Sequence, residues 1–321
     1  MCQYSEEGPV HLPNGIIVGK RWRIIKMLGE GGCGAVYMVE DMEDCQKYAL
    51  KAESNNVAGG SVLKIEVDIL MRLRGKAHVA ALIHSGKRQS FQYMVMTLLG
   101  DSLNHLIKKA PRPCSMSTLV RVGINVLHGL KQIHDIGFVH RDIKPANLAT
   151  GRVGTPEQRF LHILDFGLAR EYILKSPETN ETMMRRPRRR TLFRDKHAIA
   201  DCKKKTTDSE LLDKCPVQLL EFAAHLRTLT YFHRPDYLFL YNILMEIMVE
   251  GAFRTVGLGR TRTREQDIQA CHSGKDVGGH EEDKYNWDTF YCRQERSVEK
   301  TQDEERSPFK EEDFAINPFG F

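Results

Sequence analysis

His140-Arg141-Asp142-Ile143-Lys144-Pro145-Ala146-Asn147 is the stretch of this 321-residue chain that decides its fold. It matches the pattern H-R-D-x-x-x-x-N at every fixed position. In that pattern the aspartate accepts the proton of a hydroxyl nucleophile, and the asparagine ligates a divalent cation. A lysine two residues after the aspartate can neutralise charge on a phosphoryl group. The candidate catalytic residues are therefore Asp142, Lys144 and Asn147.

A second carboxylate motif, Asp165-Phe166-Gly167, follows eighteen residues after Asn147. D-F-G at this distance from the first motif supplies another cation-binding carboxylate. Asn147 and Asp165 are thus the candidate ligands for Mg²⁺. Two further motifs lie earlier in the chain, and the order and spacing of all four leave little room for a purely structural explanation of the set.

A glycine-rich stretch precedes both motifs and reads G-x-G-x-x-G-x-V over residues 29–36. Alone it is a weak signal, because a glycine-rich turn is about as often structural as phosphate-binding. A dinucleotide fingerprint would open a helix, and a P-loop would need Gly-Lys-Ser/Thr. Here the glycines lead into a predicted strand, and this order of strand, glycines and strand resembles the loop that covers ATP in protein kinases. The candidate residues for this part of the site are Leu28, Gly29, Gly31, Gly34 and Val36.

The next strand, Tyr48-Ala49-Leu50-Lys51, resembles the V-A-I-K strand whose lysine contacts the α- and β-phosphates. Such a lysine needs a carboxylate from the following helix, and Glu66 lies fifteen residues further on. Taken alone, Lys51 could be a solvated strand lysine and Glu66 a solvated helix charge. Together with the other motifs, Ala49, Lys51 and Glu66 become candidate ATP-site residues.

These motifs resemble those of protein kinases, and several further runs resemble the casein kinase 1 group. The resemblance implies an α+β, bilobal fold with a β-rich N-lobe and a mainly helical C-lobe. It implies ATP and Mg²⁺ as cofactors, Met96 at the gatekeeper position, and hinge backbone for adenine at Leu98 and Leu99. Two runs look more like the tau-tubulin kinase branch. The supporting runs are Leu98–Leu103, Gly137–Pro145, Leu164–Arg170 and Arg234–Tyr237 for the group, and Leu63–Val67 and Tyr285–Asp288 for the branch.

Hydrophobic periodicity predicts a three-strand antiparallel meander followed by mixed elements and then helices. A helix over 61–73 is expected to begin with Ser61 as its N-cap. A longer helix from Ser117 is expected to bury an apolar stripe. The apolar stripe of this helix is Leu119, Val122, Val126, Leu130 and Ile133. The meander spans 22–52, a further strand spans 91–96, and the other helices span 101–109, 216–227 and 236–249. The expected organisation is an extension over 1–19, an N-lobe over 20–99, a C-lobe over 100–290 and a disordered tail over 291–321.

The run after Asp165-Phe166-Gly167 departs from the kinase pattern. The substrate-docking loop, an A-P-E-like end and the following buried helix cannot be found, and no tryptophan occurs between Trp22 and Trp287. About fifty residues are expected to be missing at the Arg194–Asp195 junction, judged against the full set of kinase parts. The C-lobe is then incomplete, which leaves a weak or inactive ATP-binding scaffold as the alternative to an active kinase.

An arginine-rich run lies just before that junction. Guanidinium groups bind phosphate bidentately, and the resemblance implies acidic or pre-phosphorylated protein substrates, so an anion site is the preferred interpretation. A solvated loop and a nuclear-localisation or nucleic-acid patch are the alternatives. The candidate anion-site residues are Arg185, Arg186, Arg188, Arg189 and Arg190.

Composition narrows the class without naming a function. The chain is 41% hydrophobic and 28% charged with a formal charge of +5, values that exclude a wholly disordered or collagen-like protein. The eight cysteines form no C-x-x-C pair, which indicates free thiols in a reducing compartment. No signal peptide or membrane span is expected. We therefore expect a monomer in the cytoplasm, or alternatively the nucleus, that acts on a protein substrate and not on nucleic acid or membranes.

Overall fold

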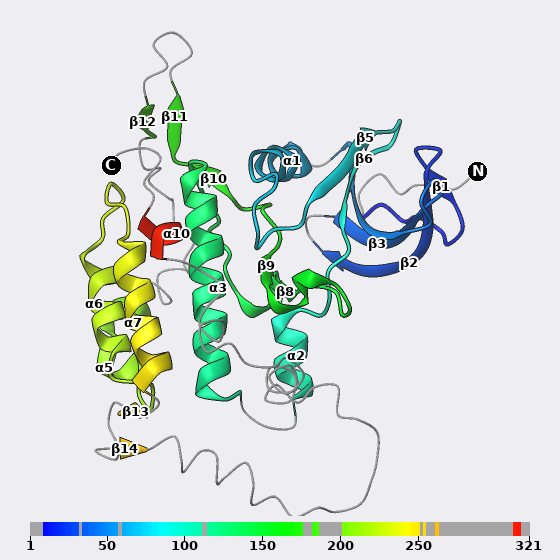
Figure 1. Ribbon diagram of the computed structural model, residues 1–321. Helices are drawn as coiled ribbons and strands as arrows, with labels where there is room; N and C mark the ends of the chain where they lie inside the picture. The colour runs from blue at the N-terminus through cyan, green and yellow to red at the C-terminus, as the bar shows by residue number, and fades with distance from the viewer. Residues whose placement is uncertain are drawn as a thin grey trace, which may run out of the picture. The chain divides into compact units, whose positions relative to one another are not determined.

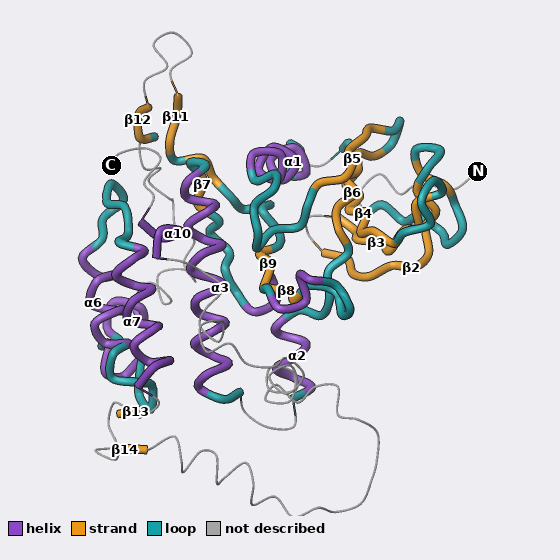
Figure 2. The backbone as a smooth tube through the Cα atoms, viewed as in Figure 1, coloured by secondary structure: helices purple, strands orange, loops and turns teal. Residues whose placement is uncertain are grey.

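The computed structural model of the protein describes residues 9–31, 34–56, 60–110, 114–175, 182–185, 201–250, 253–254, 261–262 and 311–315. Contacts divide the chain into two units. The first consists of Met1–Lys109 with His128–Leu174, and the second of Ala110–Leu127 with Lys175–Phe321. Figures 1 and 2 show a sheet with one helix beside it in the first unit, and mainly helices in the second. The α+β kinase-like fold class is confirmed.

A six-stranded sheet forms the first part of unit one, in the spatial order β1-β2-β3-β4-β6-β5. Every neighbouring pair is antiparallel. The predicted meander over 22–52 corresponds to β2, β3 and β4, and the predicted strand over 91–96 to β6. The strands are β1 Ile17–Val18, β2 Trp22–Gly31, β3 Gly34–Asp41, β4 Lys47–Ser54, β5 Leu82–Lys87 and β6 Phe91–Thr97.

One face of this sheet forms a core with the segment that precedes β1. Alternate residues of β3 point into it, and Tyr37 is fully buried among them. The Tyr37 hydroxyl donates to the carbonyl of Val10 at 2.6 Å and accepts from the N–H of Leu12 at 3.1 Å. Residues 9–18, which the sequence assigns to an N-terminal extension, are therefore packed on the sheet.

Helix α1 (Leu63–Arg72) lies where a helix over 61–73 is predicted, but its N-terminus is capped differently. The N-cap residue is Val62, which offers no side-chain cap. Instead the carboxylate of Glu53 in β4 accepts from the N–H groups of Val62 at 3.1 Å and Leu63 at 2.6 Å. Ser61 contributes one bond, from the N–H of Lys64 at 3.2 Å.

Short elements complete unit one and carry the motifs. Two small antiparallel ladders form there, one between β7 and β10 and one between β8 and β9. Helix α2 corresponds to the helix predicted over 101–109. These elements are α2 Leu103–Lys109, β7 Phe138–Val139, η1 Pro145–Asn147, β8 Leu148–Thr150, η2 Pro156–Arg159, β9 Leu161–Ile163 and β10 Arg170–Glu171.

Helix α3 (Met116–Asp135) begins where a helix is predicted, but its buried side agrees with the predicted stripe only in part. Ile133 of that stripe is fully buried, whereas Leu119 is 47% exposed and the other members are half-buried. Val120, Ile124 and Leu127, which lie outside the predicted stripe, are buried. Apolar residues occur on more than one side of this helix, so periodicity alone fits either stripe. Packing selects the second, and Gly123 within it lies against Leu244.

The second unit contains the helices predicted near 216–227 and 236–249 and several elements that the sequence does not predict. Its elements are β11 Ile173–Lys175 at the boundary, β12 Thr182–Met184, α5 Asp208–Leu211, α6 Leu219–Thr228, α7 Tyr237–Glu250, β13 Phe253–Arg254, β14 Thr261–Arg262 and α10 Glu311–Ala315. Helix α10 corrects the expectation of disorder for Glu311–Ala315, and the other residues of the expected tail, 291–310 and 316–321, lie outside the described ranges. Its Phe314 is 1% exposed and stacks on Tyr241 of α7, with ring centroids 4.3 Å apart. The Phe314 side chain therefore packs this short acidic segment against α7.

Some predictions fall on residues outside the described ranges. These are the Arg194–Asp195 junction, Trp287, and Arg186, Arg188, Arg189 and Arg190 of the proposed anion site. Within the described residues, no helix is both long and apolar enough to cross a bilayer.

Candidate active site

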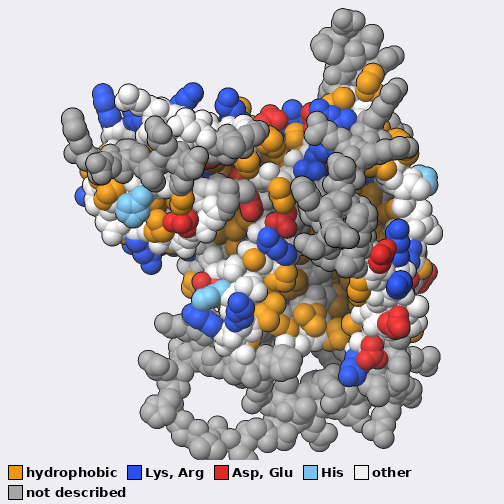
Figure 3. All heavy atoms as spheres, turned by 180° about the vertical axis from the view of Figure 1, so that it is seen from behind, with side chains coloured by type: hydrophobic (Ala, Val, Ile, Leu, Met, Phe, Trp, Pro, Cys, Tyr) orange, Lys and Arg blue, Asp and Glu red, His pale blue; other side chains and the backbone are white. Residues whose placement is uncertain are grey.

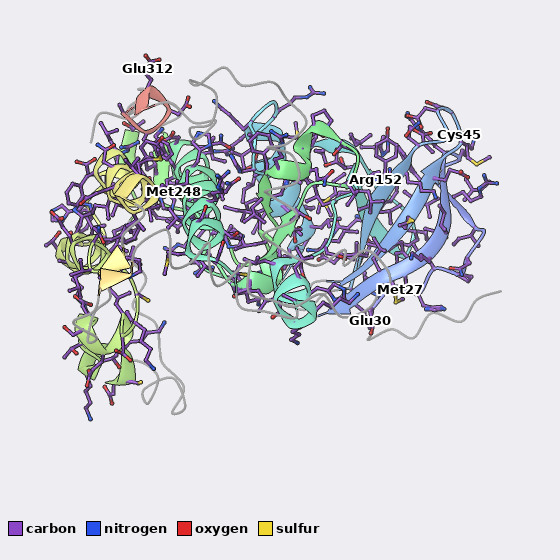
Figure 4. All side chains as sticks on the ribbon, turned by 60° about the horizontal axis from the view of Figure 1, so that its bottom comes forward. Met27, Glu30, Cys45, Arg152, Met248 and Glu312 are labelled. Carbon is purple, nitrogen blue, oxygen red and sulfur yellow. The ribbon has the colours of Figure 1, made fainter. Side chains whose placement is uncertain are left out.

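The glycine-rich stretch forms the ends of β2 and β3, where Gly31 lies opposite Gly34 and Gly29 opposite Val36. Gly34 has a φ of +105°, and a Cβ there would overlap the carbonyl of Ala52. The fold itself therefore requires glycine at 34. A Cβ at Gly29 or Gly31 would meet nothing within 4 Å. Glycine at these two positions is explained better by the close approach of a ligand. Figure 4 shows Met27 and Glu30 at this end of β2.

Strand register brings the next candidate residues onto one face of the sheet. Val36 of β3 pairs with Lys51 of β4, and Ala49 of β4 pairs with Met96 of β6. Because side chains two residues apart in a strand share a face, these four residues line the same side. That side is opposite the face on which Tyr37 is buried.

The Lys51 ammonium meets two carboxylates. It forms an ion pair with Glu66 of α1, and Asp165 lies 3.5 Å away. Lys51 and Glu66 side chains are 8% and 2% exposed. Burial raises the pKa of the Glu66 carboxyl above its usual range, and the adjacent ammonium opposes that shift. The structure thus joins three sequence-distant candidates around one cation.

The loop between β7 and η1 holds the candidate base. Lys144 Nζ lies 2.8 Å from a carboxylate oxygen of Asp142, and the Asn147 side-chain amide donates to that same oxygen at 3.0 Å. The bond from Lys144, more than any other influence, lowers the pKa of the Asp142 carboxyl. Asp142 is therefore ionised at neutral pH and can accept a hydroxyl proton.

His140 links this loop to the D-F-G motif, a role that the sequence analysis did not assign. One ring nitrogen lies 3.0 Å from the carbonyl of Leu164, and the other accepts from the N–H of Asp142 at 3.2 Å. The ring packs on Phe166 at 5.2 Å between centroids. Burial lowers the pKa of His140, so the neutral ring makes these contacts. The signal was present, since histidine opens the motif, but the motif alone does not show what the ring contacts.

The donor set fits a divalent cation bound together with phosphates. The Asn147 amide nitrogen donates to both the carbonyl and the carboxylate of Asp142, which leaves its side-chain oxygen as the atom able to ligate. Asp165 supplies a carboxylate. Among the described residues no group of three or more His, Cys, Asp or Glu side chains could hold a metal. Phosphate oxygens and water would complete the coordination, as is usual for Mg²⁺.

The predicted hinge follows β6. Leu98 and Leu99 are half-buried, and Leu28 is 44% exposed on β2. The N–H of Gly100 donates to the carbonyl of Thr150 at 2.8 Å, and a side chain at 100 would overlap Thr150. Glycine therefore lets the connection after the sheet approach β8 closely.

The anion-site prediction is represented in the structure by Arg185 alone, which is exposed. Figure 3 shows Lys and Arg side chains interspersed with acidic and apolar ones over the described part of one face. A continuous basic patch is not visible among the described residues of that face.

Comparison with known proteins agrees with the geometry. The protein kinase domain family matches residues 22–186. A protein of Caenorhabditis elegans described as a serine/threonine-protein kinase is 41% identical over 287 residues, covering 76% of this chain and 82% of that protein. A serine/threonine-protein kinase of Dictyostelium discoideum is 26% identical over 294 residues, covering 79% and 58%. Casein kinase I homolog 1 of Saccharomyces cerevisiae is 30% identical over 165 residues, covering 51% and 30%.

The family match over residues 22–186 includes the stretches that carry these motifs. A kinase domain binds ATP with a divalent metal and acts on a protein substrate. No observation favours the alternative of an inactive scaffold. The chain therefore belongs to the protein kinase family and is a serine/threonine protein kinase.

Proposed function

We propose that this kinase transfers the γ-phosphoryl group of Mg²⁺-bound ATP to serine or threonine hydroxyls of protein substrates. The observation that carries the proposal is the contact of Lys51 with Glu66 and Asp165 in the same unit as the bonds of Asp142 to Lys144 and Asn147. Asn147 and Asp165 would hold the metal, and Lys51 would contact the phosphates. Asp142 would orient the hydroxyl and take its proton.

The test is transfer of labelled phosphate from ATP to a protein substrate, with Asp142→Asn as the matched variant. The amide keeps the shape of the side chain but cannot accept the proton. We expect the rate to fall by at least about a thousandfold, the scale seen when an acid–base group and its positioning are both lost. ATP affinity is expected to change little. Equal transfer by the variant would refute the assignment of Asp142.

The finer family assignment is the casein kinase 1 group and, within it, the tau-tubulin kinase branch. Casein kinase I relatives among the matches support the group. The runs Leu63–Val67 and Tyr285–Asp288 are the residues that favour the branch. We also propose that the protein is a monomer in the cytoplasm or nucleus. Gel filtration of the purified chain tests the monomeric state.

An internal shortening near Arg194–Asp195 is also proposed, and alignment lengths support it. The Caenorhabditis elegans alignment runs over 287 positions but covers 76% of 321 residues, which is about 244. About 43 positions then have no counterpart in this chain. The coding DNA across the junction tests the proposal. Intervening coding sequence for an apolar helix would support it, and continuous DNA with no exon boundary would count against it.

Acidic or pre-phosphorylated substrates are the proposed targets, with the arginines of residues 185–190 as the anion site. Paired peptides with and without a phosphoserine on the N-terminal side of the acceptor provide the test. We expect the phosphorylated peptide to be preferred, and the preference to disappear when the arginines become alanine. Equal rates on both peptides would exclude this role.

A further inference from the structure

We infer that Arg72 is a positioning residue that ties helix α1 to the two strands flanking the catalytic motifs. Arg72 is the last residue of α1, and its guanidinium lies 3.1 Å from the carboxylate of Glu171. The same group lies over the ring of Phe138, 5.1 Å from its centroid. Glu171 and Phe138 face each other across the β7–β10 ladder. One side chain therefore contacts both members of a cross-strand pair.

The contacted strands adjoin the groups that perform the reaction. Strand β7 runs directly into His140 and Asp142, and β10 begins three residues after Gly167. Helix α1 carries Glu66, the partner of Lys51. Arg72 thus joins the helix that orients the phosphate-binding lysine to the chain on which the candidate base and the metal carboxylate lie.

The opposite end of α1 is held separately. Glu53, two residues after Lys51 in β4, accepts the N–H groups of Val62 and Leu63 at the first turn. With that end fixed and Ile69 and Leu70 buried further along the helix, a displacement of α1 that breaks the Arg72 contacts would be a swing of its last turn. A swing of this kind would draw Glu66 away from Lys51, and errors of about 1 Å in such geometry cost up to a hundredfold in rate. Arg72 restrains the end that would move.

An arginine is required for this combination of contacts. Its guanidinium also bonds the Asp68 carboxylate one turn earlier, with Nη2 to oxygen at 3.1 Å, which orients it. A planar fork can bind two carboxylates while its face covers an aromatic ring, and an ammonium cannot. The Arg72 side chain is 43% exposed, so the ion pair adds little to folding stability. Loss of the Arg72 side chain should therefore affect the position of Glu66 relative to Lys51, and hence activity, more than folding stability.

The experiment compares Arg72→Ala, Arg72→Lys and Glu171→Gln with Arg74→Ala. Arg74 lies at the same end of the helix, is exposed, and forms no ion pair with any described residue. Turnover and the affinity for ATP with Mg²⁺ are measured separately, and thermal unfolding is followed for each protein. For Arg72→Ala we expect kcat to fall about tenfold and ATP affinity about threefold, with little change in Tm. Arg74→Ala should resemble the parent.

Charge reversal separates positioning from a local loss of stability. Arg72→Glu and Glu171→Arg should each lose activity, and the double variant should recover at least part of it. The inference is overturned if Arg72→Ala keeps both kcat and ATP affinity within twofold, or if the double variant is no better than either single change. The affinity measurement needs no phosphotransfer, so a failure of this inference is distinguishable from a failure of the proposed function.

Discussion

Gly34 and Gly29 of the glycine-rich stretch have different roles. Gly34 is fixed by its positive φ and by the carbonyl of Ala52, whereas Gly29 faces open space. Gly34→Ala should lower the free energy of unfolding by about 2 kcal/mol, since both strain and overlap oppose it. Gly29→Ala should leave stability within about 0.5 kcal/mol but weaken ATP affinity, because the added methyl occupies space near the phosphates.

Denaturant unfolding and ATP titration of both variants check this separation. The reverse pattern, a destabilised Gly29→Ala with a stable Gly34→Ala, would show that the two roles are misassigned. Equal effects of both changes on ATP affinity would also contradict it.

The chemistry-bearing residues were predictable from the sequence because phosphoryl transfer admits few residue types at each position. Lys51, Asp142 and Asp165 are identified by their motifs, and their roles stay predictions. What the sequence could not show is contact between distant segments. Glu53 looks like an ordinary strand acid, and Arg72 like a solvated helix charge, until the fold places their partners beside them.

Helix α1 gives the clearest prediction at the level of elements, because its cap comes from another element. Glu53→Gln keeps the shape but removes the charge that faces the helix N-terminus. We expect about 1 kcal/mol less stability and faster amide exchange in the first turn of α1. Ser61→Ala, at the position where the sequence predicts the cap, should cost less.

Hydrogen exchange of Leu63 and its neighbours, with denaturant unfolding, measures both effects. A larger loss for Ser61→Ala than for Glu53→Gln would restore the sequence-based cap and remove Glu53 from that role.

Among elements, predictability followed the strength of the periodic signal. The meander over β2–β4 and helix α7 have long apolar patterns, and both were predicted. In strand β5 (Leu82–Lys87) only Leu82 and Gly86 are half-buried and the other residues are exposed, so no alternation of apolar and polar residues marks the strand. Helix α10 packs on α7 through the ring of Phe314, a contact that no local pattern encodes.

Packing of α10 (Glu311–Ala315) on α7 brings together two segments that are distant in the sequence. Limited proteolysis of the whole protein tests this contact. Phe314→Ala should release the segment, because the other side chains of α10 are polar or small. Protease cleavage near residues 311–315 should accelerate severalfold, the response expected of a segment whose local stability is lost. Glu312→Ala is the matched control, since Glu312 is exposed and points away from the fold in Figure 4. Equal cleavage rates for the two variants would contradict the docking.

Acid sensitivity of the whole fold should depend on His78. Burial lowers the pKa of His78 to about 4 from its ordinary 6.5. Between these values the unfolded chain binds a proton that the folded chain does not. The free energy of unfolding therefore falls as pH drops from about 6.5 to 4, by up to about 3 kcal/mol for this residue. His140 and His162, whose pKa values are also lowered by burial, act in the same direction.

His78→Asn tests that contribution. Asparagine tolerates the positive φ of 63° at this position and can still donate to the carbonyl of Leu161. The variant should show a shallower loss of stability between pH 6.5 and 4 in denaturant titrations. An unchanged slope would mean that His78 does not contribute to acid unfolding.

The hydrogen bonds of the Tyr37 hydroxyl limit how far the N-terminus of this protein can be shortened. The kinase family match begins at residue 22, which invites removal of everything before it. Yet that hydroxyl is buried on one face of the sheet and forms hydrogen bonds with the backbone of Val10 and Leu12. Truncation at residue 20 would remove both hydrogen-bond partners of this buried hydroxyl and expose the apolar core beside it. The unpaired hydroxyl alone would lower the free energy of unfolding by about 1–3 kcal/mol. We therefore expect a stably folded shortened version of this kinase to begin before Val10, upstream of its recognisable motifs.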